Sequence, residues 1–297
     1  MTGLRRLVLL ASALPLAACA KGVLGPAGPV AAANRTILLN ALAIMLAIVV
    51  PTIIATLAFA WWYRADNARA TYRPEFVYSG RIELIVWSIP ILTILFLAGV
   101  IWTGSHQLDP SVPLASEKRQ RALDVQVVSL DWKWLFIYPN QGVASVNRMV
   151  VPVGAPVRMT LTSASVLNTF FVPNLVSQVY TMNGMALPLH MQADRPGTYY
   201  GTSGHFSGDG FSDMDFAVEA VPAAAFAGWV ARAKAAGEPL DARTYPLLAR
   251  QSTKDRPRTY RAVQPGLFDA IVGQKLPPAP GPTEGRGGPH TSPGDES

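Results

Sequence analysis

Apolar residues form two long runs in the first third of the chain. Residues 36–63 contain no charged side chain, and residues 82–103 contain only Glu83. Each run is long enough for an α-helix to cross a hydrocarbon core of ~30 Å, which takes ~20 residues. Trp61 and Trp102 lie at the ends of the runs, where aromatic rings favour the membrane interface. We therefore expect two transmembrane helices in an antiparallel hairpin, over residues 36–63 and 82–103.

The pattern changes from helical to alternating after a Pro-containing linker, residues 104–122. Apolar and polar residues alternate in Leu123–Val127 and again in Val157–Leu161, while Trp132–Tyr138 is aromatic and β-prone. Turns that contain Pro and Gly separate these runs at a spacing typical of a β-sandwich. We predict an all-β, sandwich or barrel domain over residues 123–221.

The last part of the chain divides into two segments of different composition. Residues 222–275 begin with apolar residues at helical spacing, from Phe226 to Ala233, and continue as a polar region interrupted by Pro. We expect a partly helical extension on the outer surface, and the sequence assigns it no function. Residues 276–297 are rich in Pro and Gly and poor in large apolar residues, which predicts a disordered tail.

The amino terminus has the layout of a secretory signal. Residues 1–18 contain two arginines, a short apolar run and then small residues. Leu16–Cys19 resembles a bacterial lipobox, in which the signal is removed before a cysteine that is then lipidated. The alternative is a lone cysteine in a plain signal peptide. Because Cys19 is the only cysteine and lies at the expected cleavage point, we predict a lipid anchor there, followed by a short tether over residues 19–35.

The charge distribution indicates a membrane topology and no nucleic-acid partner. The net charge is +6, without a block of five or more like charges. The loop between the apolar runs, residues 64–81, is positive: Asp66 and Glu75 are outnumbered by Arg64, Arg69, Arg73 and Arg81. The positive-inside rule places this loop in the cytoplasm. Both ends of the chain then face outward, in agreement with an exported amino terminus.

Several classes of site are excluded by composition. A single cysteine permits no intrachain disulfide, no Cys-based zinc site and no paired-thiolate copper site. The chain has no nucleotide-binding glycine motif. The aspartates near residue 210 are better explained as turn residues than as paired catalytic carboxylates.

Four segments in the expected order resemble subunit II of the haem-copper oxidases: Ile82–Pro90, Asp131–Tyr138, Ser165–Pro173 and Arg195–Gly201. The resemblance covers roughly residues 30–220. The lipobox and the extension carry it almost to Lys275 for the quinol-oxidising branch, which includes the cytochrome bo-type ubiquinol oxidases. This branch has a cupredoxin-like domain that lacks the binuclear copper of its relatives.

The resemblance implies a role and a set of partners. The chain is expected to be the haem-free accessory subunit of a respiratory oxidase that oxidises ubiquinol, reduces O₂ to water and pumps protons. Haems and catalytic copper would belong to a subunit I, with further small membrane subunits, lipids and ubiquinol as the other partners. The complex would lie in the bacterial cytoplasmic membrane, with the β-domain on the periplasmic face.

The residues at the family's copper-ligand positions differ from those that bind copper. The copper-bearing branch uses two His, two bridging Cys, a Glu and a Met. The resemblance places at these positions Asn168, Ser203, His205, Ser207, Phe211 and Met214, of which only the Met is retained. Hydroxyls and a phenyl ring cannot replace thiolates and imidazole as soft ligands. We therefore expect that this subunit binds no metal or other cofactor, and that electrons come from a quinol in the membrane.

Glu83 has two interpretations. From the residues alone, it is a solvated carboxylate at a helix N-terminus, stabilised by the macrodipole. Ile82–Pro90 also matches the family's Ile-Glu-x-x-x-Trp-x-x-Pro pattern, in which this Glu lies at the mouth of a proton path into subunit I. The resemblance therefore favours a part in proton uptake.

Other readings remain open from the sequence. Soft donors for a mononuclear copper could come from Met182, Met185, His190, Met191, His205 and Met214, although Met more often fills gaps in a core. Trp132 and Trp134 could receive electrons, as in the branch that uses cytochrome c, or could simply pack. Two alternative functions follow: a cytochrome c oxidase subunit II that transfers electrons, or a membrane-anchored lipoprotein that delivers copper.

Overall fold

The computed structural model describes residues 22–71 and 73–277. The chain forms two compact units, residues 33–108 and the combination of residues 1–32 with 109–297. The expected signal peptide, Cys19 and almost all of the expected tail lie outside the described residues.

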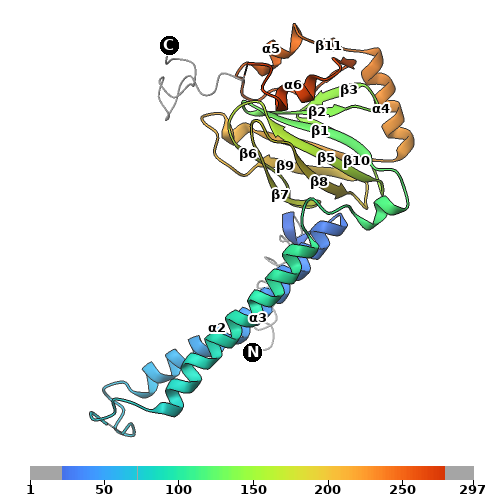
Figure 1. Ribbon diagram of the computed structural model, residues 1–297. Coiled ribbons are helices and arrows are strands. Elements are labelled where there is room, and N and C mark those ends of the chain that lie inside the picture. The colour runs from blue at the N-terminus through green and yellow to red at the C-terminus, as the bar shows by residue number, and fades with distance from the viewer. Residues whose placement is uncertain (1–21, 72, 278–297) are drawn as a thin grey trace, which may run out of the picture. The chain divides into compact units, whose positions relative to one another are not determined.

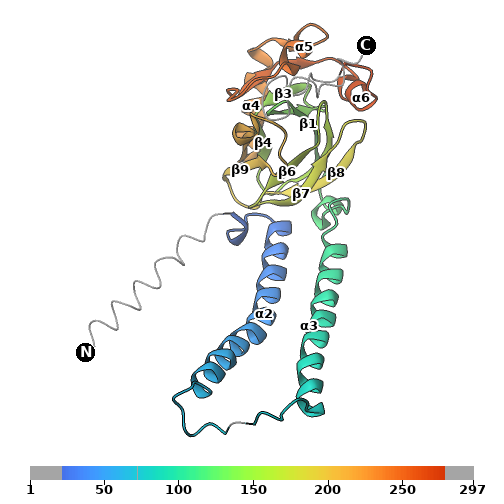
Figure 2. The same cartoon turned by 90° about the vertical axis from the view of Figure 1, so that its left-hand side faces the viewer.

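The smaller unit contains two long apolar helices, which Figure 2 shows joined by a loop at one end. They are α2 (Pro29–Trp62) and α3 (Gly80–Gln107), and each reaches a mean hydropathy of 2.6, with length and composition sufficient to cross a membrane. A Cβ at Gly104 would lie 2.5 Å from Ile37 Cδ1, so the helices meet where residue 104 has no side chain. Because α2 starts and α3 ends at this contact, the hairpin is antiparallel.

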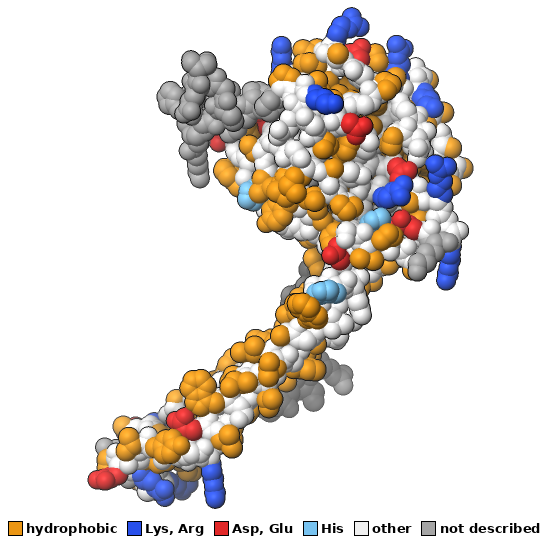
Figure 3. All heavy atoms as spheres, viewed as in Figure 1, with side chains coloured by type: hydrophobic (Ala, Val, Ile, Leu, Met, Phe, Trp, Pro, Cys, Tyr) orange, Lys and Arg blue, Asp and Glu red, His pale blue; other side chains and the backbone are white. Residues whose placement is uncertain are grey.

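Apolar side chains cover the visible face of the hairpin, and charged side chains gather toward its loop end (Figure 3). An apolar surface of this extent in water would be unfavourable, so these helices require lipid or protein neighbours. Helix α2 begins at Pro29, earlier than the expected residue 36, because Pro is well suited to the first turn of a helix and the alanines that follow favour the helix.

Two β-sheets form the body of the larger unit (Figure 1). The six-stranded sheet has the order β12 (Arg258–Tyr260), β3 (Val143–Val146), β2 (Lys133–Tyr138), β1 (Leu123–Leu130), β5 (Pro156–Ser163) and β8 (Leu187–Gln192). The five-stranded sheet has the order β4 (Arg148–Pro152), β10 (Asp215–Val221), β9 (Gly197–Ser203), β6 (Asn168–Val172) and β7 (Val176–Thr181).

Short elements complete the larger unit. The 3₁₀ turns are η2 (Gly22–Leu24), η3 (Ala115–Lys118) and η4 (Phe211–Asp213). The C-terminal extension contains α4 (Ala223–Ala235), α5 (Thr244–Ala249), α6 (Leu267–Val272) and a two-stranded sheet of β11 (Pro239–Leu240) and β13 (Ala262–Val263).

Strand β2 is buried on both of its faces. Trp134 and Phe136 point into the core between the two sheets, and Leu135 and Ile137 belong to a second apolar cluster beneath the C-terminal extension. Figure 1 shows α5 and α6 over the side of the sandwich formed by β1, β2 and β3. The extension therefore covers a sheet face that would otherwise be apolar and exposed.

A buried lysine fastens this cover to the sheet. The Lys133 side chain is 1% exposed, and its ammonium donates to the Arg250 carbonyl at 2.7 Å and to the Ser252 hydroxyl. Asp255 Oδ2 lies 3.4 Å from Lys133 Nζ. Burial lowers the pKa of Lys133, and the Asp255 carboxylate partly opposes this shift. The polar contacts of Lys133 thus all go to the segment that closes the second cluster.

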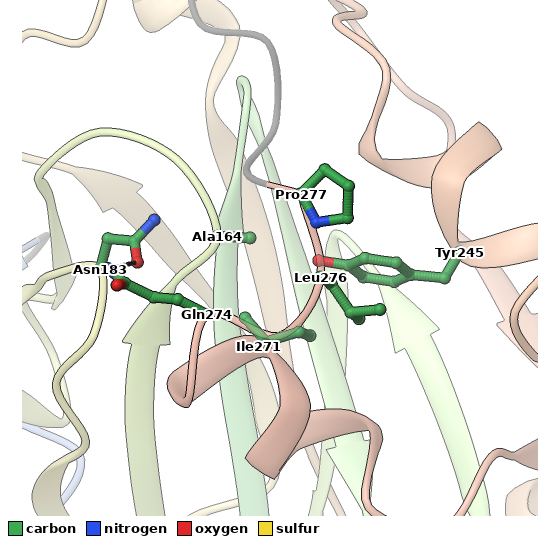
Figure 4. Close-up of a pocket in the computed structure, with 7 residues that line it drawn as sticks. All are labelled: Ala164, Asn183, Tyr245, Ile271, Gln274, Leu276 and Pro277. Carbon is green, nitrogen blue, oxygen red and sulfur yellow. Dashed lines mark hydrogen bonds between the residues drawn. The ribbon is translucent and has the colours of Figure 1, made fainter. Parts of the chain in front are cut away.

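A small cavity lies between the sandwich and the extension (Figure 4). Its volume is about 210 Å³, and its lining includes Ala164, Tyr245 and Ile271. The Gln274 amide donates to Asn183 Oδ1 at 2.8 Å and links the two parts. Tyr245 is 4% exposed, and burial raises the pKa of its phenol.

Candidate functional site

The six positions compared with copper ligands come together at one end of the five-stranded sheet. Asn168 is the first residue of β6 and Ser203 is the last residue of β9, and these strands pair antiparallel with Phe170 opposite Ser203. The loop from β9 to β10 carries the other four, His205, Ser207, Phe211 and Met214. The strand pairing therefore brings the positions together irrespective of which side chains occupy them.

A hydroxyl and an amide fill the interior of this site. Ser203 Oγ donates to Asn168 Oδ1 at 3.2 Å, and it accepts a hydrogen bond from the Thr169 backbone N–H at 3.3 Å. Asn168 is 1% exposed and Ser203 is 4% exposed. Both side chains are satisfied within the protein, which is the usual state of buried polar groups.

The loop is closed by an indole ring. Trp132 Nε1 donates to the Ser207 carbonyl at 3.0 Å, and a Cβ at Gly210 would lie 2.3 Å from Trp132 Cδ2. Trp132 itself has a left-handed backbone with φ of 60°, in the tight turn between β1 and β2. The Ser207 hydroxyl is 4.0 Å from the sulfur of buried Met214. The Trp132 ring and its hydrogen bond to Ser207 therefore hold this part of the loop.

His205 and Phe211 make aromatic contacts near the surface. The His205 ring is edge-on to Tyr180 with centroids 6.1 Å apart, and the Phe211 ring is edge-on to Phe206 at 5.7 Å. Tyr180 and Phe206 are 48% and 64% exposed. The ring of Phe211 has no atom able to bind a metal, so the second His position supplies no donor.

This donor set does not fit a binuclear copper centre. Two bridging thiolates would be needed, and the site offers none: its donors are two hydroxyls, an amide, the imidazole of His205 and one thioether. Within residues 22–71 and 73–277, no three His, Cys, Asp or Glu side chains form a group that could hold a metal ion.

The residues considered for a mononuclear copper take part in different contacts. His190 is buried on β8, and its Nδ1 lies 2.6 Å from Glu117 Oε1. Met191 is buried in the core between the sheets, whereas Met185 is 46% exposed. His190 is therefore paired with Glu117, and Met191 is a core residue. Trp134 is likewise fully buried in the core.

Glu83 lies in the first turn of α3. Its Oε2 accepts a hydrogen bond from Trp87 Nε1 at 3.1 Å, and its backbone N–H donates to the Ser79 carbonyl at 3.0 Å. The two side chains are one helical turn apart and are exposed on the isolated chain. The Glu and the Trp of the sequence pattern therefore act as one hydrogen-bonded pair. Cys19 lies outside the described residues.

The sequence does not indicate two of these contacts. It does not indicate that Gly210 admits the Trp132 ring, or that Lys133 is buried beneath the extension. The high proportion of Gly in the loop was a signal for close packing, but it did not indicate which glycine faces which ring.

Comparison with known families and proteins gives a consistent result. Residues 140–221 match the family described as cytochrome c oxidase subunit II, periplasmic domain, and residues 234–276 match the family described as COX aromatic rich motif. Ubiquinol oxidase subunit 2 of Acetobacter aceti is 47% identical over 268 residues, covering 90% of this chain and 87% of that protein. The chain belongs to the ubiquinol oxidase subunit 2 family.

Two further proteins are similar to parts of this chain. Cytochrome bo(3) ubiquinol oxidase subunit 2 of Pseudomonas aeruginosa is 44% identical over 89% of this chain and 79% of its own length. The periplasmic domain of subunit II of cytochrome oxidase of Bradyrhizobium japonicum is 27% identical, with a TM-score of 0.37, over 39% of this chain and 96% of that structure.

Membership in the ubiquinol oxidase subunit 2 family confirms the resemblance drawn from the sequence. The expected fold class is also confirmed: two long apolar helices precede a cupredoxin-like sandwich and a partly helical extension. Most of the extension, residues 234–276, matches the aromatic rich motif, so this segment is also part of a known family.

Proposed function

We propose that this chain is the haem-free accessory subunit of a membrane-bound quinol oxidase that oxidises ubiquinol, reduces O₂ to water and pumps protons. Its partners are a subunit I that holds the haems and the catalytic copper, and further small membrane subunits. The observation that carries the proposal is the hydrogen bond between the Ser203 hydroxyl and the Asn168 amide. By resemblance, these two residues stand where the copper-bearing branch has a Cys ligand and a His ligand. This interior is complete as a hydrogen-bonded structure and offers no soft ligand pair.

In this proposal the outer domain transfers no electrons. Electrons from a water-soluble donor would need a copper centre in the sandwich, whereas a quinol dissolved in the bilayer can deliver them to subunit I directly. The domain then has a structural role on the outer face. The apolar helices α2 and α3 bind subunit I and lipid, which cover their exposed apolar surface.

Glu83 takes protons from the cytoplasm into subunit I in this account. The carboxylate can accept a proton from water at the N-terminus of α3 and release it toward a path in the partner. The Trp87 indole donates to the carboxylate and fixes the direction in which it points. An ionisable group held in this way at membrane depth is typical of proton relays.

The topology follows from the charged loop and the amino terminus. The Arg-rich loop between α2 and α3 faces the cytoplasm, so the sandwich lies on the periplasmic side of the bacterial cytoplasmic membrane. Processing before Cys19 and lipidation of its thiol add an anchor on the same side. The lipid holds the amino terminus to the membrane independently of α2.

Deletion of the gene in its native host tests the proposal. Membranes from the deletion strain should lose ubiquinol-dependent O₂ uptake and the haem spectrum of the assembled oxidase, and the full chain supplied from a plasmid should restore both. Assembly and turnover that persist without the chain would contradict the proposal.

A further inference from the structure

The segment that follows Cys19 is bound to one end of the sandwich and does not hang as a loose tether. Asn174 Nδ2 donates to the carbonyl oxygens of Gly22 at 3.0 Å and Gly25 at 2.8 Å. The Asn174 carbonyl accepts from the Ala27 N–H at 2.7 Å, and Ala27 is only 4% exposed. One asparagine therefore fixes three points of a short segment.

A second loop holds the same segment from the other side. The Asp194 N–H donates to the Ala27 carbonyl at 2.8 Å, and Arg195 Nη2 donates to the Pro26 carbonyl. A Cβ at Gly28 would lie 2.1 Å from the Gln192 carbonyl oxygen, so only glycine permits this approach. Residues 22–28 form a strap with a defined path, and the position of Gly22 is set by the sandwich.

A pocket of about 650 Å³ opens beside the start of the strap. Its lining includes Gly22, Pro173, Asn174, Arg195, Tyr199 and Tyr200. Tyr199 Oη donates to the Arg195 carbonyl at 2.8 Å, and Tyr200 is 56% exposed. The pocket thus combines aromatic and proline surfaces with a guanidinium and phenols, as suits an amphiphilic group at the membrane interface.

We propose that this pocket seats the processed amino terminus, residues 19–21, with the glyceryl thioether of Cys19 packed against Tyr200. The inference rests on the proposed lipidation of Cys19. Gly22 is itself part of the pocket wall, and three residues span at most ~10 Å, so Cys19 cannot lie far from the pocket. Because residues 19–21 are covalently joined to the strap, Cys19 is held near the pocket at an effective concentration on the order of millimolar. This favours Cys19 over a free lipid that competes for the pocket.

Seating would fix the point at which the acyl chains leave the protein. The strap leads directly into Pro29, the first residue of α2, so only residues 22–28 would separate a seated anchor from the start of this helix. Asn174 is then a positioning residue for the anchor. A bilayer phospholipid that fills the pocket is the main competing occupant.

Photo-cross-linking in the native complex tests this seat. A benzophenone amino acid replaces Tyr200, and a matched control carries it in place of Tyr180, which is 48% exposed on β7 and does not line the pocket. Trypsin cleaves after Lys21, so mass spectrometry can identify the Cys19–Lys21 lipopeptide attached to the probe. We expect this adduct at residue 200 only. Replacing Asn174 by Ala should lower its yield roughly tenfold by removing two hydrogen bonds to the strap.

Several outcomes of the cross-linking experiment would contradict the proposal. A phospholipid adduct at residue 200, equal lipopeptide adducts at residues 180 and 200, or no adduct with the lipopeptide would overturn the seat. The mass of the free Cys19–Lys21 peptide reports lipidation independently. An unmodified peptide would refute lipidation, and with it the lipid seat, even if the peptide itself cross-links.

Discussion

The ring of Trp132 lies directly against Gly210, where a Cβ would be 2.3 Å from Trp132 Cδ2. This contact closes the loop between β9 and β10. The contact and the hydrogen bond from Trp132 Nε1 to the Ser207 carbonyl together order the loop.

Gly210→Ala should therefore destabilise the outer domain by about 1–3 kcal/mol, the typical cost of overpacking. Thermal unfolding of the purified complex, followed by tryptophan fluorescence, measures the loss. Gly204→Ala is the matched control in the same loop, because the atoms nearest to its Cβ would be those of the flexible Gln178 side chain, from 3.3 Å. Equal effects of the two substitutions would show that Trp132 does not hold the loop.

Much of the fold could be predicted because its signals are local. Apolar runs indicated α2 and α3, and alternation indicated β1 and β5. Burial of β2 on both faces was not predictable in this way, since its second face is covered by residues more than a hundred positions later, as in the Lys133–Arg250 contact. Polar Lys133 within an aromatic strand suggests a solvent-facing position until its distant partners are known.

The candidate site likewise has a part that the sequence predicts and a part that it does not. Resemblance identified Asn168 and Ser203 through their neighbours in sequence, and strand pairing then explains why they meet. The roles of Trp132 and Gly210 depend on a contact between residues 78 positions apart in the chain. No local pattern in the sequence encodes this contact.

In the Lys133–Asp255 pair, removing the carboxylate should be more harmful than removing the ammonium. Asp255→Ala leaves a buried ammonium without its carboxylate and should cost about 3 kcal/mol. Lys133→Met replaces the charge by a flexible apolar side chain and should cost less. Limited proteolysis of residues 250–258 reports release of the extension. Lys254→Met, at a side chain that is 77% exposed, should have little effect. A larger loss for Lys133→Met than for Asp255→Ala would contradict this account.

Stability should fall as the pH rises above about 10. Burial raises the pKa of the Tyr138 and Tyr245 phenols above the ordinary value of 10.0, so the folded state retains protons that the unfolded state releases. Each such tyrosine removes up to about 1.4 kcal/mol per pH unit between its unfolded and folded pKa values. Tyr138→Phe should make the decline in the free energy of unfolding with pH shallower. Thermal unfolding at about pH 9, 10 and 11 measures this slope. An unchanged slope would contradict the assignment to Tyr138.

Glu83→Gln should lower quinol oxidase turnover roughly tenfold or more, because the amide retains an acceptor for Trp87 but carries no titrating proton. Trp87→Phe is the control that removes the hydrogen bond and leaves the carboxylate, and it should have a much smaller effect. O₂ uptake by the purified complex measures both. Full turnover of the Glu83→Gln complex would exclude this residue from proton uptake.

The most direct test of the central claim compares electron donors for the purified complex. O₂ uptake is recorded with ubiquinol and, separately, with reduced cytochrome c at the same enzyme concentration. A site in which Ser203 and Asn168 occupy copper-ligand positions predicts turnover with ubiquinol and none above background with cytochrome c. Turnover with cytochrome c at a rate comparable to that with ubiquinol would contradict the claim that electrons come from the membrane.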